Sequence, residues 1–134
     1  GAPLGELRAA LRQNNPVKAL ETIAGLDRSD LAALDPSECV TLAGWLEDSG
    51  HPIAATHLLR GCLARRGPAQ DLADVYLTLG LMRLRQGQPA AAYQHLLGVF
   101  DHNPSEQTAK RAREALERIN IYRGAGGERG RRLS

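Results

Sequence analysis

The chain contains 134 residues, which is enough for one domain with its own core, and its formal net charge of +2 by itself points to no class of partner. Hydrophobic residues make up 43% of the chain and aromatic residues only 4%, and alanine and leucine outnumber β-branched residues, which favours helices over a sheet. No apolar run reaches the roughly 18–20 residues that cross a bilayer, so no membrane-spanning helix is expected.

Proline, glycine and asparagine divide the chain into helix-length segments. Proline is tolerated in the first turn of a helix, and glycine commonly ends one, as expected at Gly50 and Gly87. Ser29 or Asp30 is expected to cap a short helical turn, and Ser105 to cap the last helix. The expected helices run from Leu4 to the break at Asn14 and over about 16–26, 29–34, 36–49, 52–66, 71–86, 89–102 and 105–122. Residues 123–134 are glycine-rich and charged, and are predicted to form a flexible basic tail.

One short pattern occurs three times along the chain. A turn residue precedes a proline, an alanine follows three residues later, and an apolar residue comes four residues after the alanine. The prolines, at positions 16, 52 and 89, lie 36 and 37 residues apart. A period in the mid-thirties with helical content predicts stacked helix pairs, and such stacks usually bind other molecules rather than transform them.

Residues 73–106 resemble a tetratricopeptide repeat. The residues that carry the resemblance are Tyr76, Leu79 and Gly80 on the first helix, Ala92 and Leu96 on the second, and the closing Pro104. Gly80 and Ala92 are small where the two helices would cross closely, whereas Arg83 departs from the tyrosine that the family prefers. Residues 36–70 look like a second copy whose proline, Pro68, arrives one residue late, and residues 4–27 resemble a degraded first copy with Arg8 at the small position.

The resemblance implies an all-α, right-handed stack of three tetratricopeptide-like helix pairs. The stack would occupy residues 1–122, with residues 105–122 as a capping helix that covers the last repeat. In this family the first helix of each pair lines a concave groove. The corresponding positions here are Val40, Thr41, Gly44, Glu47, Leu77, Thr78, Leu81 and Leu84. These residues predict an apolar groove, which either is open to a peptide, a helix or another subunit, or is covered by the C-terminal helix or a second copy of the chain.

The C-terminal end concentrates positive charge. Residues 1–106 hold 9 basic and 12 acidic residues, whereas residues 107–134 hold 8 basic and 3 acidic ones. The basic residues of this end are Lys110, Arg111, Arg113, Arg118, Arg123, Arg129, Arg131 and Arg132. They form either a solvated helix face, paired with Glu114 and Glu117, or a patch that holds phosphates of nucleic acid or anionic lipid.

No motif for catalysis, metal binding or a cofactor is recognised in the sequence, so none of the three is expected. The two cysteines, Cys39 and Cys62, fall on core positions of one repeat and are expected to be buried thiols, with a disulfide between them as the alternative. Trp45 either packs on the preceding helix pair or anchors a partner.

The sequence thus predicts a protein-interaction or scaffold module that binds a peptide, helix or subunit. The bound subunit could be a second copy of the chain, which would make a homodimer. The alternative function is contact with nucleic acid or an anionic membrane surface through the basic end. The chain begins with glycine, and we expect a soluble piece of a larger protein. It is expected in the cytoplasm, with the soluble part of a membrane-associated protein as the alternative.

Overall fold

The computed structural model describes the backbone of residues 2–65 and 67–133, and side chains as far as Asn120. Within these residues every regular element is a helix and no strand occurs, so the all-α prediction is confirmed. The elements are α1 (Ala2–Arg12), α2 (Pro16–Ile23), α3 (Arg28–Ala32), α4 (Pro36–Asp48), α5 (Pro52–Leu63), α6 (Ala69–Arg85), α7 (Pro89–Gly98), the 3₁₀ turn η1 (Val99–His102) and α8 (Glu106–Leu133).

The turns between helices use the residues that the sequence placed there. Gly50 and Gly87 have φ values of 85° and 72°, in the left-handed region where glycine has no steric penalty. Asn14 and Asn103 take the same conformation with φ values of 53° and 49°, which asparagine tolerates better than most residues. Helices α2, α4, α5 and α7 then begin with proline, because their first turn has no use for the missing N–H.

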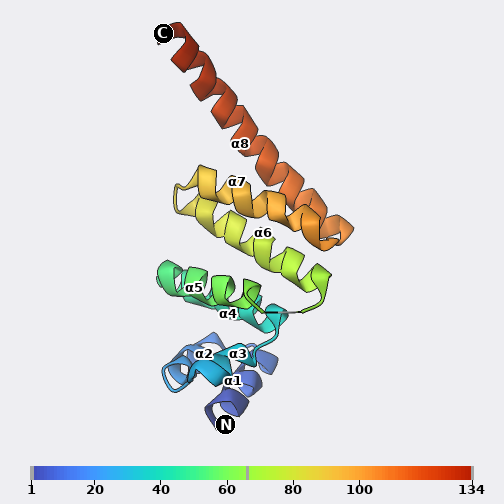
Figure 1. Ribbon diagram of the computed structural model, residues 1–134. Coiled ribbons are helices and arrows are strands. Elements are labelled where there is room, and N and C mark those ends of the chain that lie inside the picture. The colour runs from blue at the N-terminus through green and yellow to red at the C-terminus, as the bar shows by residue number, and fades with distance from the viewer. Residues whose placement is uncertain (1, 66, 134) are drawn as a thin grey trace.

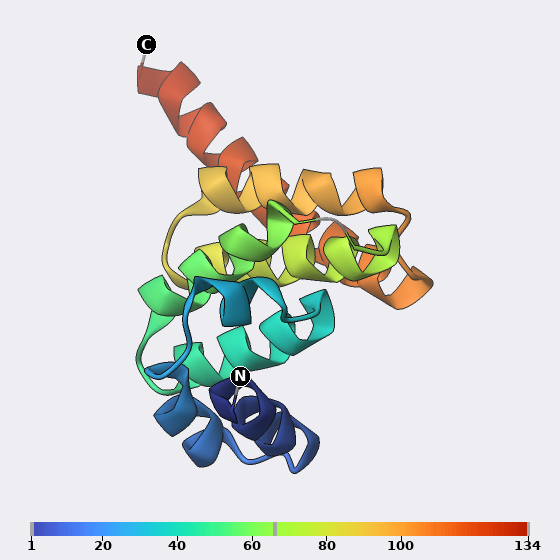
Figure 2. The ribbon, with the colours of Figure 1, turned by 60° about the horizontal axis from the view of Figure 1, so that its bottom comes forward.

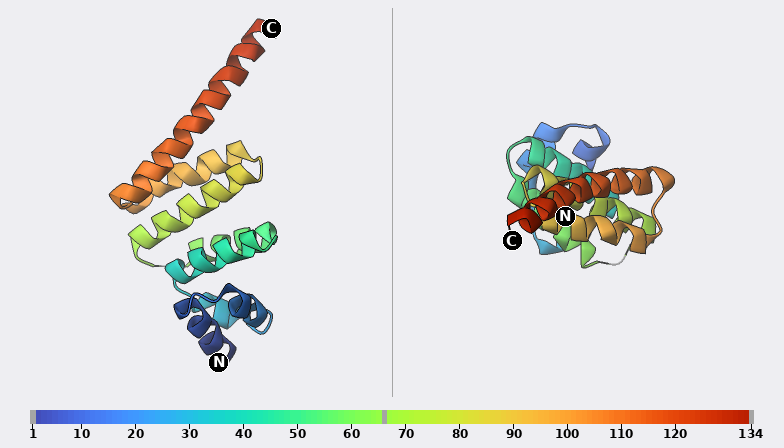
Figure 3. Two further views of the ribbon diagram at one scale, coloured as in Figure 1. Left: turned by 180° about the vertical axis from the view of Figure 1, so that it is seen from behind. Right: turned by 90° about the horizontal axis from the view of Figure 1, so that it is seen from above.

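Helices that follow one another pack in pairs, and the pairs follow one another along one axis (Figure 1). Helices α1 and α2, α4 and α5, and α6 and α7 form the three pairs, and α3 connects the first pair to the second. The view from behind shows the same succession, ending with α8 across the last pair (Figure 3). In the tilted view the second part of α8 extends beyond the other helices (Figure 2).

Two clusters of buried side chains form the core. The N-terminal core gathers residues from α1 to α5 and one face of α6, and includes Leu7, Leu42, Leu59 and Leu79. The C-terminal core joins the other face of α6 to α7 and α8 and consists of Ala73, Leu77, Ala92, Leu96, Val99, Ala112, Ala115 and Ile119. Helix α6 therefore belongs to both cores and holds the two parts of the stack together.

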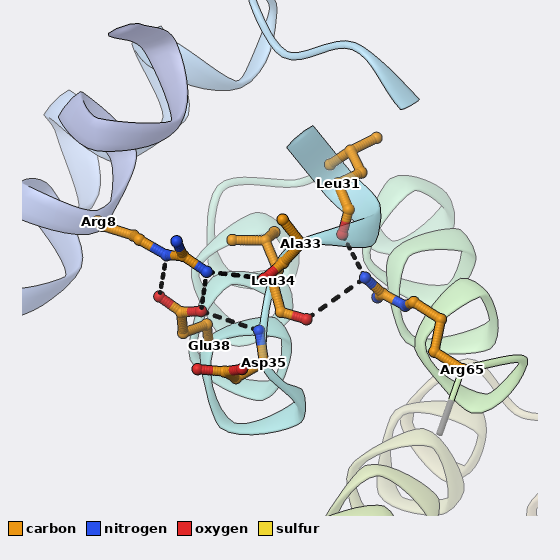
Figure 4. Close-up of polar contacts among 7 residues, drawn as sticks. All are labelled: Arg8, Leu31, Ala33, Leu34, Asp35, Glu38 and Arg65. Atoms are coloured by element: carbon orange, nitrogen blue, oxygen red, sulfur yellow. Dashed lines mark hydrogen bonds and ion pairs between the residues drawn. The ribbon is translucent and has the colours of Figure 1, made fainter. Parts of the chain in front are cut away.

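Two arginines hold the connection between the first and second helix pairs (Figure 4). Arg8 of α1 donates to the Ala33 carbonyl at 2.7 Å and pairs with Glu38 of α4, with 3.2 Å between Nε and Oε2. On the other side, Nη1 of Arg65 donates to the carbonyl oxygens of Leu31 and Leu34. The guanidinium of Arg8 thus binds the end of α3 and the first turn of α4.

Some boundaries differ from those predicted. The N-cap of the short helix α3 is Asp27 rather than Ser29 or Asp30. Its Oδ1 accepts from Asp30 N at 2.8 Å, and Asp30 Oδ2 accepts from Asp27 N at 3.1 Å, which completes a capping box. The last turn before Asn103 is 3₁₀ rather than α-helical. Ser105 caps α8 as predicted, because its Oγ accepts from Thr108 N at 3.2 Å.

The largest difference concerns the end of the chain. Helix α8 continues to Leu133, although a helix end near Tyr122 and a flexible tail over 123–134 were predicted from the glycines. Glycine lowers helix propensity without terminating a helix, and no proline follows Pro104 to end it. The arginine, glutamate, alanine and leucine residues between and after the glycines are good helix formers, and the prediction underestimated them.

Candidate functional site

The predicted groove residues of α4 lie at different depths. Thr41 is exposed, Gly44 is half-buried, and Val40 is half-buried against the N-terminal core. The half-buried Glu47 forms a salt bridge with Arg85 of α6, with 2.6 Å between Oε1 and Nη2. A bidentate arginine–carboxylate pair therefore links the two helices and makes this end of the predicted groove polar.

The predicted residues of α6 are mostly covered. Leu77 is only 3% exposed, and Leu81 and Leu84 are half-buried against the same C-terminal core. The hydroxyl of Thr78 donates to the Asp74 carbonyl at 2.8 Å, so it is occupied within its own helix. The groove was predicted to be either open or covered, and at Leu77 it is covered by the last helix of the chain itself.

Helix α8 is held against α6 by a polar contact in its first turn and by an apolar stripe that follows this turn. The hydroxyl of the buried Thr108 donates to Asp74 Oδ1 at 2.7 Å. Ala112, Ala115 and Ile119 follow at spacings of three and four residues and are buried, which is the periodicity of one helix face. The stripe alternates with charged residues, so α8 buries one face and leaves the other in solvent, as a terminal helix of a stack requires.

Towards their C-terminal ends helices α6 and α8 diverge, as the view from behind shows (Figure 3). The divergence leaves an open cavity of about 510 Å³ between α8 and the α6–α7 turn, which we call the wedge. Four apolar side chains and two arginines line it together with one glycine. The lining residues are Leu81, Leu84, Pro89, Ile119, Arg85, Arg118 and Gly87.

The two arginines of the wedge differ in their electrostatic state. Arg85 is paired with Glu47, whereas the exposed Arg118 forms no ion pair with any residue of the described part of the chain. Glu114 and Glu117, which were expected to pair with basic residues of the same helix, form no salt bridge with any described basic side chain. The wedge therefore combines an apolar floor with one uncompensated positive charge.

Sequence reasoning found Leu81, Leu84 and Arg118 but assigned them to separate surfaces. Arg85, Gly87, Pro89 and Ile119 were not predicted, because nothing in the chain indicates how far along α6 the last helix would dock. The apolar stripe of α8 could have been read from its spacing, but the residues opposite to it could not.

The remaining basic residues divide into two groups. Lys110, Arg111 and Arg113 are exposed on α8, outside the wedge. The side chains of Arg123, Arg129, Arg131 and Arg132 lie outside the described residues. Lys110 and Arg111 share a shallow depression with Glu106 and Glu114, so this part of the surface carries both signs of charge.

The two cysteines are buried and not joined to each other, as predicted for core thiols. A guanidinium nitrogen of Arg65 lies 3.4 Å from the sulfur of Cys39. A hydrogen bond with Cys39 lowers the pKa of Cys62, burial opposes this shift, and the charge of Arg65 lowers the pKa further. Among the described residues, no group of three or more potential ligands is placed to hold a metal ion.

Trp45 is half-buried and packs on the N-terminal core, as do Ile23 and Leu26 of the preceding helix pair and the segment after it. His95 and His102 are both half-buried beside Tyr76. The ring of His102 stacks on Tyr76 with 5.0 Å between centroids, a contact that spacing along the chain did not indicate.

No protein-family model, curated protein or solved structure matches the chain. Within the residues that the structure describes, no helix combines the length and apolar character that crossing a membrane takes.

Proposed function

We propose that this chain is a protein-interaction module built of tetratricopeptide-like helix pairs, and that the wedge binds an apolar segment of a partner protein that carries an acidic residue. The observation that carries the proposal is the apolar floor of the wedge, where Leu81, Leu84 and Ile119 surround an open cavity. Beside it lies Arg118, which forms no ion pair with a described residue.

The packing of the third helix pair supports the tetratricopeptide resemblance. A Cβ atom at Gly80 would lie 2.6 Å from Cγ of Leu96 and 3.4 Å from the Ala92 carbonyl oxygen. The helices therefore cross where the resemblance places its small residues. At the same crossing a Cβ at Gly98 would lie 2.8 Å from the ring of Tyr76, the residue that opens the repeat.

The chemistry of the wedge favours a particular kind of occupant. Apolar grooves between helices accept the apolar face of a helix or an extended apolar segment, and a cavity of about 510 Å³ holds a few side chains. Arg118 at the rim would pair with a carboxylate of that segment, which fixes its orientation and penalises a basic competitor. Arg85 is already neutralised by Glu47, so a single acidic residue matches the charge of the site.

The test uses peptides selected from a random displayed library against the wild-type chain. Their affinity is then measured by fluorescence anisotropy for the wild type, Arg118→Glu and Arg111→Glu. Arg111 is the matched control, because it is an exposed arginine on the same helix that does not line the wedge. We expect selected peptides to combine apolar residues with an acidic one, and Arg118→Glu to weaken binding about tenfold or more while Arg111→Glu changes it less than about twofold.

Methyl NMR spectra locate the contact directly, because binding in the wedge must shift the methyl signals of Leu81, Leu84 and Ile119. The proposal fails if these signals stay unchanged while the peptide binds. Equal loss of affinity in both variants together with a steep salt dependence would instead favour the alternative function, in which the basic residues of α8 contact nucleic acid or anionic membrane. Light scattering over a concentration series separates peptide binding from self-association of the chain.

A further inference from the structure

A second cavity lies between α5 and the α6–α7 turn, apart from the wedge. It measures about 160 Å³, and four of its lining residues follow one another at helical spacing on one face of α5. We call it the cationic crevice. It is lined by Ile53, Thr56, His57 and Arg60 of α5, by Arg83 of α6, and by Gln86 and Gln88 of the turn.

The side chain of Arg83 is held in place by two amide groups. Its Nη1 atom donates to Gln88 Oε1 at 2.7 Å and to Gln86 Oε1 at 3.3 Å. The amide nitrogen of Gln86 in turn lies 3.5 Å from the Thr56 hydroxyl. The Nε atom of Arg83 is buried and has no hydrogen-bond partner among the described residues. A donor in this state is costly unless an acceptor meets it.

No residue that the structure describes neutralises the positive charge of the crevice. None of the described residues that line it is acidic, and neither Arg60 nor Arg83 forms an ion pair with a described residue. The charges of both arginines also act on the neighbouring His95. Burial and then the charges of Arg83 and Arg60 lower the pKa of His95 below its ordinary value.

We propose that the cationic crevice binds a single phosphate group. Arg60 and Arg83 approach from different helices, and His57 adds a third donor from the wall of α5. Guanidinium groups recognise phosphate with two parallel hydrogen bonds, and donors that converge from several sides suit its tetrahedral oxygens better than a planar carboxylate. A cavity of about 160 Å³ admits one phosphate group and excludes a stack of bases. The phosphate is either free or carried by a phosphorylated side chain.

The proposal explains the residue at which the third repeat departs from the tetratricopeptide pattern. The family prefers tyrosine where this chain has Arg83, and a guanidinium that is partly buried without a carboxylate is unfavourable in a purely structural role. The inference does not depend on the proposed function, because the two cavities share no lining residue.

The experiment titrates the full chain with inorganic phosphate and follows backbone and glutamine side-chain amides by NMR. Ionic strength is kept constant with chloride. We expect saturable shifts confined to the 53–60 and 83–88 segments, including the side-chain amides of Gln86 and Gln88. The same titration with blocked phosphoserine and with blocked serine distinguishes the sources. Tighter binding of phosphoserine than of free phosphate assigns the site to a phosphorylated protein, and the reverse order assigns it to a small phosphate ligand.

Two variants and one control keep the test independent of folding. Arg83→Met and the exposed Arg60→Met should each weaken phosphate binding about tenfold or more, because each removes a charged donor. Arg12→Met is the control, since Arg12 is also an exposed arginine in the last turn of a helix and forms no ion pair with a described residue. The proposal is overturned if phosphate and chloride give the same shifts, or if Arg60→Met binds phosphate as the wild type does.

Discussion

Replacing Gly80 by alanine tests the helix crossing on which the third repeat depends. The added Cβ would lie 2.6 Å from both Cγ and Cδ2 of Leu96, a side chain that is fully buried. The Cγ atom is the branch point of Leu96, so it cannot move aside unless the side chain changes rotamer or α7 shifts. We therefore expect overpacking to cost about 1–3 kcal/mol. The higher helix propensity of alanine offsets about 1 kcal/mol of this cost, so the free energy of unfolding should fall by about 0–2 kcal/mol.

Gly44→Ala is the matched control, because Gly44 also lies inside a helix and a Cβ there would meet no atom within 4 Å. This substitution should stabilise the protein by about 0.5–1 kcal/mol. The two variants gain the same helix propensity, so the difference between their effects on stability gives the cost of overpacking at Gly80. It is measured as the difference in the free energy of unfolding from urea titrations followed by circular dichroism.

A larger residue at position 80 extends the same test. Gly80→Leu should cost about 3 kcal/mol or more, because the excess volume cannot be accommodated without separating α6 from α7. Combining Gly80→Ala with Leu96→Ala should recover part of the loss, with a coupling energy of about 0.5–3 kcal/mol. If Gly80→Ala stabilises the protein as much as Gly44→Ala does, the helices do not cross closely and the reasoning is wrong.

The remaining predictions concern the core and its thiols. Cys39 and Cys62 should react slowly with a thiol reagent in the native protein and rapidly in denaturant, as followed by mass spectrometry; fast native labelling would show that the α4–α5 core opens. Leu77→Asp should cost about 3 kcal/mol or more in the free energy of unfolding, because it buries a carboxylate under α8, and a near-neutral result would mean that α8 detaches. Gly98→Ala should destabilise the protein and displace the Tyr76 ring from His102, which NOE contacts between the two rings would reveal; unchanged contacts would refute this.

The positions of the helices could be predicted from the sequence because local rules decide them. Proline starts four of the helices, and Gly50 and Gly87 adopt the left-handed conformation that ends the preceding ones. The capping of α8 by Ser105 also depends only on residues that are close in the sequence. The close approach at Gly80 and the burial of both cysteines also followed from the sequence, since the repeat pattern specifies which face of each helix meets its neighbour.

One local rule, that glycine ends a helix, predicted a wrong boundary. Glycines after Tyr122 were taken to end the last helix, yet α8 continues through them to Leu133. Glycine lowers the stability of a helix by about 1 kcal/mol per residue without forbidding it. Such a preference identifies a boundary only when proline or a capping side chain supports it.

The candidate sites, in contrast, were decided by the tertiary structure alone. The wedge depends on where α8 docks along α6, and the cationic crevice depends on the approach of Arg83 to Arg60 in another helix pair. Both sites join residues separated by more than twenty positions in the sequence. The sequence determined which residues are helical and which faces are apolar, because those properties arise within one or two turns of chain. Which faces meet, at what register and with what gap between them is decided by the packing of whole side chains against each other, and this appears only in the folded protein.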